Sequence, residues 1–288
     1  MIDSSQLSAN SGSLYVVATP IGNLADLSSR AVEVLGSVDR IAAEDTRHSG
    51  RLMQYCSIQT PMLALHEHNE RELAPRLVED MLKGRSIALI SDAGTPLISD
   101  PGFNLVRLAR EAGVQVVPVP GPSALICALS VSGLPTDRFV FEGFLPAKRS
   151  ARRNRLEQLC GETRSLVFFE SSHRIVDCLQ DCEAVFGGQR HAVVARELTK
   201  QFETVHGDTL EKLARWVSDD PYQQKGEIVL LVQGRPETQS HEVTPEAERI
   251  LLILLEELPI KKAAKLAARM TGVNKRALYD RALRLKKT

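Results

Sequence analysis

The chain has 288 residues, 43% of them hydrophobic, with 36 basic and 36 acidic side chains. This length suggests about two domains, and the hydrophobic content is ample for a packed core, which excludes a chain disordered throughout. No apolar run approaches the roughly 20 residues of a membrane span and the N-terminus lacks a secretory signal, so we expect a cytoplasmic protein without membrane contact.

The first dozen residues, 1–12, are polar and are expected to form a disordered tail. After them, short apolar runs rich in β-branched residues alternate with amphipathic stretches, a pattern typical of α/β proteins. The predicted strands are 14–19, 40–45, 86–91, 114–119, 138–143, 165–170, 191–197 and 226–234. The predicted helices between them are 69–83, 103–112, 122–132, 149–160, 173–186 and 208–218.

Two breaks divide this pattern. A proline and a cluster of basic residues near 143–153 predict a domain boundary between Ser132 and Ala151, and 235–246 has the composition of a linker. We therefore expect an N-terminal α/β domain over 13–135, a second α/β domain over 136–235 and a helical region over 236–288.

Three loops leave the carboxyl ends of predicted strands and turn on Gly and Pro: 19–24 (TPIGNL), 92–102 (DAGTPLISDPG) and 119–124 (VPGPSA). Such turns are common in α/β domains, but ligands bind outside the carboxyl ends of the strands, so three together predict one shared site. None of the loops carries Lys or Arg, and no G-x-G-x-x-G follows the first strand, which argues against a phosphate or dinucleotide ligand.

Backbone groups exposed at glycines, with aspartates nearby, suit a ligand that has a flat base, a zwitterionic end and a positive centre. S-adenosylmethionine fits that description.

Long segments then point to a family, among them LYVVATPIGNL, ALISDAGTPLISDPG, VPVPGPSALICALSVSGLP, FFESSHRI and ARELTKQFE. In these segments the chain resembles the 16S ribosomal RNA cytidine 2′-O-methyltransferase branch of the tetrapyrrole methylase superfamily. The resemblance implies two α/β domains with the S-adenosylmethionine cleft between them, a small C-terminal helical domain and a homodimer. It also implies 2′-O-methylation of a cytidine ribose in the decoding centre of small-subunit ribosomal RNA. Fold membership alone would not choose this substrate.

The same resemblance implies cofactor contacts in the three loops and in the second domain. They fall on Pro20, Ala93, Gly94, Thr95, Ile98, Ser123, Ala124, Glu170 and Leu198. Many members of the superfamily have Gly-Asp-Pro where this chain has Gly94-Thr95-Pro96. If the sulfonium requires a carboxylate, Asp92 or Asp100 must therefore supply it.

Methyl transfer to a ribose hydroxyl requires an in-line approach and can use a base that accepts the proton. The candidates at strand ends or loops are Asp100, Glu170, His173, Arg174, Glu197 and Lys200. Each is also explained as an ion-pair or helix-capping residue. Lys200 and His173 are preferred for positioning or deprotonating the nucleophile, and the sequence does not choose between them.

No metal site is predicted. The five cysteines include no Cys-x-x-Cys pair, and no His-Glu-x-x-His is present. His66 and His68 alternate onto one face of a strand, and we expect residues 66–69, Glu67 included, to face solvent or RNA together with Asp45 and Arg47.

The C-terminal region is strongly basic: residues 259–288 contain six Lys and four Arg but one Asp, a net charge of +9, which leaves −9 for the rest. Helices are predicted over 244–258, 259–273 and 274–286, with a stop at Gly272. A helix-turn-helix with outward basic residues predicts RNA binding, with contacts at Lys261, Lys265, Arg276 and Arg284. The alternative is a solvated charged surface on a helical bundle.

Two other functions remain open from the sequence. One is a methyltransferase acting on a small tetrapyrrole-like substrate, which the loops permit but the basic C-terminal region argues against. The other is a non-catalytic RNA-binding or assembly factor, which would not need the three loops.

Overall fold

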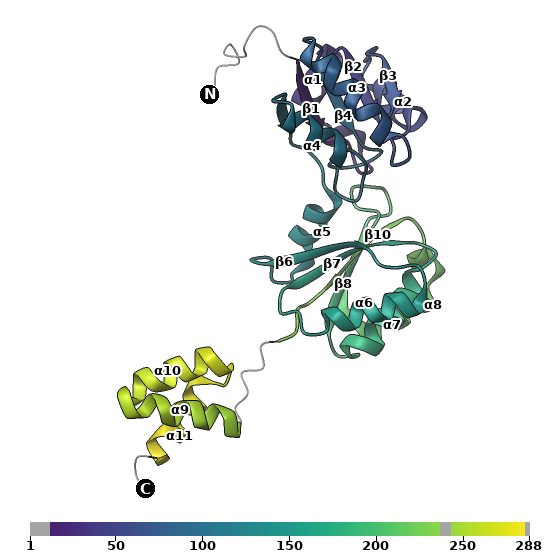
Figure 1. Cartoon of the computed structure of the whole chain (residues 1–288). Coiled ribbons are helices and arrows are strands. Elements are labelled where there is room, and N and C mark those ends of the chain that lie inside the picture. The colour runs from purple at the N-terminus through teal and green to yellow at the C-terminus, as the bar shows by residue number, and fades with distance from the viewer. Residues whose placement is uncertain (1–11, 237–242, 286–288) are drawn as a thin grey trace. The chain divides into compact units, whose positions relative to one another are not determined.

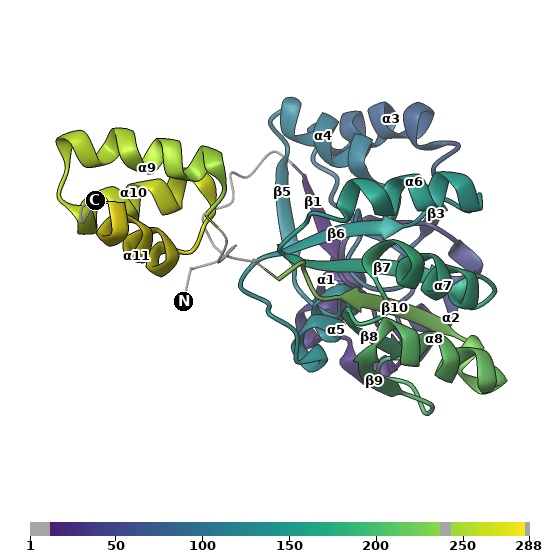
Figure 2. The same cartoon turned by 90° about the horizontal axis from the view of Figure 1, so that it is seen from below.

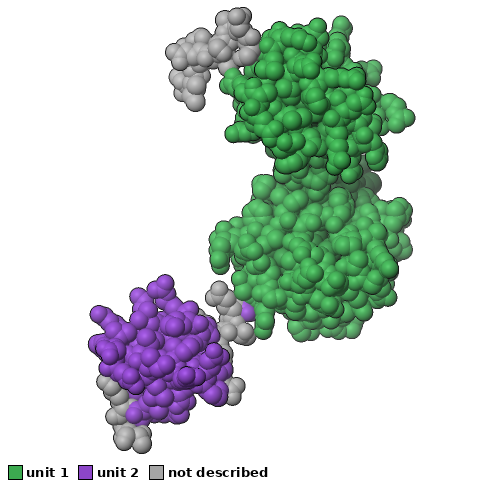
Figure 3. Space-filling model, viewed as in Figure 1, with its two compact units in different colours: residues 1–235 green, residues 236–288 purple. Residues whose placement is uncertain are grey.

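The computed structural model describes residues 12–236 and 243–285. The chain divides into two compact units, 1–235 and 236–288, which are coloured separately in Figure 3. The tail predicted at 1–12 lies outside the described residues except for Gly12. Among the described helices, none combines the length and apolar character that crossing a membrane requires.

The first sheet of the larger unit is parallel, with the strand order β3-β2-β4-β1-β5. Its two faces are covered by different helices (Figure 1), as parallel sheets require. Ile87 and Leu89 of β4 pack with α3 and α4, whereas Ala88 and Ile90 pack with α1 and α2. The strands are β1 (Ser13–Val17), β2 (Arg40–Ala43), β3 (Met62–Ala64), β4 (Ile87–Ile90) and β5 (Gln115–Val119), and the helices are α1 (Ser29–Ser37), α2 (Thr46–Tyr55), α3 (Glu70–Leu82) and α4 (Phe103–Glu111).

Strand β5 forms one edge of this sheet and pairs only with β1. Pro118 lies opposite Val16, and the carbonyl of Val119 accepts a hydrogen bond from the Ala18 amide at 3.2 Å. Backbone groups of neighbouring strand residues point to opposite edges, so Pro118 faces away from β1, where its missing N–H costs no hydrogen bond.

The second sheet has the order β6-β7-β10-β8-β9. Strands β6 and β7 are parallel, and the other pairs are antiparallel. One core is formed with α6, α7 and α8, and a separate core with α5 lies on the opposite face. The strands are β6 (Phe139–Phe144), β7 (Ser165–Ser171), β8 (His191–Arg196), β9 (Thr204–Thr209) and β10 (Glu227–Val232), and the helices are α5 (Ala124–Ser132), α6 (Arg149–Leu159), α7 (Ile175–Phe186) and α8 (Leu210–Asp219).

The smaller unit contains α9 (Pro245–Glu257), α10 (Ile260–Thr271) and α11 (Lys275–Leu285), which are drawn in Figure 2. These helices pack around a core of small and branched residues. Thr244 caps α9 by accepting a hydrogen bond from the Ala247 amide. Gly272 ends α10 in the left-handed conformation at φ 70°. The predicted helix boundaries in this region are therefore confirmed to within a few residues.

The α/β class is confirmed, and every predicted strand and helix of the larger unit is present within a few residues. Strands β3 and β9 and helices α1 and α2 were not predicted. The two sheets lie in one compact unit, and the domain boundary expected near residue 135 stays a prediction.

Candidate functional site

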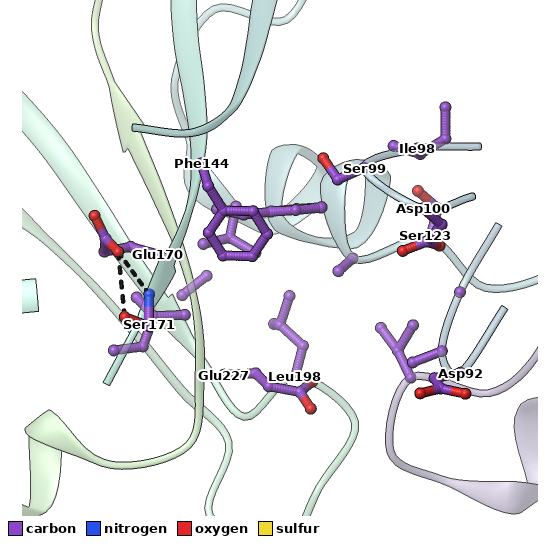
Figure 4. Close-up of a pocket in the computed structure, with 18 of the residues that line it drawn as sticks. Asp92, Ile98, Ser99, Asp100, Ser123, Phe144, Glu170, Ser171, Leu198 and Glu227 are labelled. Atoms are coloured by element: carbon purple, nitrogen blue, oxygen red, sulfur yellow. Dashed lines mark hydrogen bonds between the residues drawn. The ribbon is translucent and has the colours of Figure 1, made fainter. Parts of the chain in front are cut away.

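A cavity of about 430 Å³ opens in the larger unit at the carboxyl ends of β1 and β4, facing the second sheet (Figure 4). Its volume is within the range of small-molecule sites, roughly 300–1,000 Å³. The first sheet and its loops contribute Ile21, Glu44, Asp92 to Thr95, Ile98 to Asp100, Ser123 and Ala124. The second contributes Phe144, Phe169 to Ser172, Ala195, Leu198 and Gly226 to Val229.

The three predicted loops meet at this cavity and are bonded to one another. Thr19 and Gly94 form a two-bond antiparallel bridge, with N···O distances of 2.8 and 3.0 Å. The Thr95 hydroxyl donates to the Pro122 carbonyl at 3.1 Å, which joins the second loop to the third. Gly94 has φ 82°, and a β-carbon there would be 3.3 Å from Ile21 Cγ2, so the bridge needs glycine.

Helix α5 begins at the cavity. Ser123 is its N-cap residue and Ala124 its first residue, and both line the cavity. The Ser123 side chain makes no capping hydrogen bond, so the first-turn amides of α5 keep unsatisfied donors and a partial positive charge. This end of the cavity suits an anionic group such as a carboxylate.

Three carboxylates, Glu44, Asp92 and Asp100, also line the first-sheet side, and no Lys or Arg is among the lining residues. Asp92 accepts a hydrogen bond from the Asp45 amide at 3.1 Å, and the Asp92 amide donates to Glu44 at 3.4 Å. Burial raises the pKa of Asp100 to about 6; repulsion by Glu44 and Asp92 adds to this, and a hydrogen bond from Ser91 opposes it. Burial also raises the pKa of Glu44, with the charge of Asp92 contributing. The cavity therefore carries concentrated negative charge.

Contacts between the two halves hold the cavity in shape. The Thr199 hydroxyl accepts a hydrogen bond from the Asn23 amide at 3.1 Å. A β-carbon on Gly143, in the bulge of β6, would be 3.2 Å from the Ser99 hydroxyl. Ser99 itself has φ 70° and Thr199 φ 67°, positive values that cost energy in residues other than glycine and concentrate at binding sites.

Nine of the ten predicted cofactor contacts line the cavity: Asp92, Ala93, Gly94, Thr95, Ile98, Ser123, Ala124, Glu170 and Leu198. Pro20 does not. Glu170 is fully buried, accepts from the Ser171 amide at 2.7 Å and is paired with Arg174 at 3.3 Å. Its charge is thus neutralised by a neighbour.

Of the six predicted catalytic candidates, Asp100 and the ion-paired Glu170 line the cavity; Lys200, His173, Arg174 and Glu197 do not. The Lys200 ammonium bonds to Glu197 at 2.8 Å and Glu227 at 3.3 Å. Burial lowers the pKa of Lys200, but the hydrogen bond to Glu197 and the charge of Glu227 outweigh it and raise the pKa overall. Burial alone would raise the pKa of Glu197, but the hydrogen bond from Lys200 outweighs it and lowers the pKa overall. Neither group is suited to accept a proton.

Sequence reasoning missed most of the second-sheet lining, including Phe144, Phe169, Ala195 and Gly226 to Val229. Phe144 lies just beyond a predicted strand and the others lie within predicted strands. The way these strands pair in the sheet decides which strand end reaches the cavity, and no local pattern reports that.

His66 and His68 lie in the turn between β3 and α3, so their predicted placement on one strand face is wrong. The turn forms because Asn69 accepts from the His66 amide at 2.8 Å and donates to the Ala64 carbonyl at 3.0 Å. Across the described residues, no group of His, Cys, Asp or Glu is arranged to hold a metal ion.

The smaller unit has a shallow basic depression of about 490 Å³ on α10 and α11, lined by Lys261, Asn274, Lys275, Arg276 and Tyr279. Lys261 and Arg276, two of the four predicted RNA contacts, meet there. Lys265 and Arg284 are exposed but do not line it.

Family models match both parts of the chain. The model of the tetrapyrrole (corrin/porphyrin) methylases matches residues 13–214, and that of the RsmI C-terminal HTH domain matches 241–286. Ribosomal RNA small subunit methyltransferase I of Haemophilus influenzae is 55% identical over 270 residues, 93% of this chain and 95% of its own. The protein of that name from Pseudomonas aeruginosa is 56% identical over 275 residues, 95% of this chain and 98% of its own.

Solved structures resemble the larger unit in fold. A diphthine synthase has a TM-score of 0.58 at 17% identity and covers 76% of this chain and 89% of its own. A uroporphyrin-III-C-methyltransferase from Thermus thermophilus has a TM-score of 0.51 at 19% identity and covers 77% of this chain and 94% of its own. At such identities the likeness concerns the fold alone.

Proposed function

The chain belongs to the tetrapyrrole methylase family and groups there with ribosomal RNA small subunit methyltransferase I, and from this membership we propose that it methylates small-subunit ribosomal RNA. The methyl donor is S-adenosylmethionine, and the acceptor is the 2′-oxygen of a cytidine ribose in the decoding centre. Because the proposed substrate is ribosomal, we propose that the protein acts in the cytoplasm. We propose further that it acts as a homodimer.

The observation that carries the donor assignment is the charge of the cavity. Glu44, Asp92 and Asp100 line it, and no Lys or Arg is among the lining residues, which suits a cationic ligand. The amides at the start of α5 suit a carboxylate, and apolar residues such as Ile21, Leu198 and Val229 suit a flat base. S-adenosylmethionine combines these three chemical features. When bound, it supplies an electrophilic methyl group on a positively charged sulfur.

The nine lining residues predicted from the sequence are proposed as its binding residues. Pro20 is proposed to act indirectly, because the adjacent residues Thr19 and Ile21 shape the cavity.

Asp100 is the proposed proton acceptor for the ribose hydroxyl. It lines the cavity, and a pKa of about 6 leaves it ionised at neutral pH while keeping it more basic than an ordinary carboxylate. Lys200, held between Glu197 and Glu227, is proposed to position the loop after β8. His173 is exposed and outside the lining, so we give it no chemical role.

The smaller unit is proposed to bind the RNA backbone through Lys261, Lys265, Arg276 and Arg284. The sequence-based alternative, a small tetrapyrrole-like substrate, is not favoured. Relatives that share more than half of their residues with this chain, over nearly its whole length, are named for ribosomal RNA.

The test supplies purified protein with labelled S-adenosylmethionine and small ribosomal subunits from cells that lack this enzyme. Mass mapping of the RNA should find one new methyl group on a cytidine ribose. A methyl group on a base alone, or transfer to a tetrapyrrole but not to RNA, would contradict the proposal. Calorimetric titration with S-adenosylmethionine tests the donor separately.

A further inference from the structure

Helix α6 presents a dense basic cluster that the proposed chemistry does not use. Residues 148–155, KRSARRNR, contain five basic side chains and no acid, although the larger unit as a whole is acidic. One of them, Arg155, is neutralised by Glu142 at 2.6 Å. The remaining four are Lys148, Arg149, Arg152 and Arg153.

Three of these arginines converge on one carboxylate. The buried Asp181 of α7 bonds the buried Arg152 at 2.7 Å, Arg149 at 3.0 Å and Arg153 at 2.8 Å. A single negative charge cannot balance three positive ones. Two positive charges therefore remain at the surface, where the side chains of Arg149 and Arg153 are 62% and 43% exposed.

The contact geometry also fixes these two guanidinium groups. Arg149 and Arg153 each use Nε to reach Asp181, and their terminal nitrogens make no hydrogen bond to the residues that the structure describes. Each keeps four N–H donors for an external acceptor. A guanidinium group that a carboxylate already holds in place loses little entropy when it binds a phosphate, and its planar pair of donors matches phosphate geometry.

The basic cluster begins close to the cavity. Strand β6 ends at Phe144, which lines the cavity and is 55% exposed, and Lys148 is the N-cap residue of α6 four positions later. Four residues of extended chain span at most about 14 Å between α-carbons. An RNA strand that places one nucleotide in the cavity would thus bring the phosphates of the neighbouring nucleotides within reach of the N-terminal end of α6.

We infer that Lys148, Arg149 and Arg153 form a phosphate-binding face for the ribosomal RNA substrate, within the larger unit and additional to the basic helices of the smaller one. The inference rests on the proposed function. Charge separates the two tasks: the acidic cavity accepts the cationic donor and repels phosphate, while the α6 face holds the RNA backbone outside it.

The test compares two variants that each lose three positive charges. One is Lys148→Gln/Arg149→Gln/Arg153→Gln, which keeps the buried Arg152–Asp181 pair. The control is Arg76→Gln/Lys83→Gln/Arg107→Gln on the surfaces of α3 and α4, where each cation is paired with an acid four residues away. Affinity for unmethylated small ribosomal subunits is measured at several salt concentrations.

We expect the α6 variant to lose about three phosphate contacts and to bind small ribosomal subunits at least tenfold more weakly at 0.15 M salt. Its plot of log affinity against log salt concentration should be shallower by roughly 0.7 to 0.9 for each phosphate that is no longer bound. Its affinity for S-adenosylmethionine should stay within about twofold of wild type. The control variant should stay within the same limit for both S-adenosylmethionine and small ribosomal subunits. Equal RNA affinity and slope in the α6 variant and the control would overturn the inference.

If the triple variant fails to fold, Lys148→Gln/Arg149→Gln removes only exposed charges and decides the same question. Binding is scored without methyl transfer. A wild type that binds subunits but methylates none contradicts the proposed function, whereas weaker subunit binding by the α6 variant still supports the phosphate-binding face.

Discussion

The Lys200 side chain lies directly against Gly22: a β-carbon on Gly22 would be 2.4 Å from Lys200 Cγ and 2.9 Å from the Thr199 hydroxyl. At its other end Lys200 bonds Glu197 and Glu227. One side chain thus connects the loop after β1 to the loop after β8 and the start of β10. Lys200, preferred as a catalytic residue from the sequence, is placed to hold the two halves of the larger unit together.

Replacing Gly22 should open the cavity. Gly22→Val would force Lys200 and the 19–24 loop apart, and we expect S-adenosylmethionine affinity to fall at least tenfold and stability by about 1–3 kcal/mol. The matched control is Gly36→Ala in α1, where a β-carbon meets nothing within 4 Å. That variant should keep its affinity for S-adenosylmethionine, and its free energy of unfolding should rise by up to about 1 kcal/mol. Calorimetry and urea unfolding measure both, and equal affinities in the two variants would refute the assigned role of the loop.

Asp100→Asn should reduce turnover far more than donor affinity. Removing a general base typically costs roughly 10²- to 10⁴-fold in rate. In the wild type, the rate should fall as pH drops below about 6, where Asp100 becomes protonated. The measurement is single-turnover methylation across pH for both proteins. A variant with wild-type rate and the same acidic limb would remove Asp100 from the chemistry.

The same substitution should increase stability above pH 6. The pKa of Asp100 rises from 3.8 to about 6 on folding, so the folded protein binds this proton more tightly than the unfolded chain does. The free energy of unfolding therefore falls as pH rises through that window and stays lower above it. The full difference corresponds to about 3 kcal/mol, and solvent screening of this half-buried carboxyl reduces our expectation to about 1 kcal/mol. Denaturation at pH 4 and pH 8 tests it: the window lies between 3.8 and about 6, so the advantage of Asp100→Asn should be small at pH 4 and fully present at pH 8.

Asp181→Ala should be strongly destabilising, because it leaves the buried Arg152 without its partner. Removing one member of a buried pair typically costs about 3–5 kcal/mol. Glu142→Gln, which breaks the more exposed pair with Arg155, should cost under about 1 kcal/mol. Urea unfolding of the two variants should rank them in this order, and similar costs would show that Arg152 finds another partner or solvent.

A chain that ends after Pro236 should retain the cavity and bind S-adenosylmethionine normally. All lining residues lie before that point, and the cut preserves the hydrogen bond from the Arg235 amide to the Glu162 carbonyl. Loss of the basic helices should weaken binding to small ribosomal subunits and flatten its salt dependence. Unchanged affinity with a parallel salt slope would leave the smaller unit without a role in RNA binding.

The sequence predicted the first-sheet side of the site well because each loop follows an apolar strand and turns on its own Gly and Pro residues. It failed at β9, where TVHGDT has polar residues and a glycine and lies at a sheet edge with little burial. It also failed for Lys200, because Glu227, a bonding partner, is 27 residues away in the chain. Local patterns specify elements and turns, whereas the pairing of distant charges depends on which strands become neighbours in a sheet, here β8 and β10.

Pro118 has a consequence for self-association. An exposed edge strand offers unpaired backbone groups to any extended chain, and a proline facing that edge removes a donor where an added strand would need one. Strand β5 therefore resists sheet extension by a second copy. The proposed homodimer is therefore not expected to form through a continuous sheet across β5.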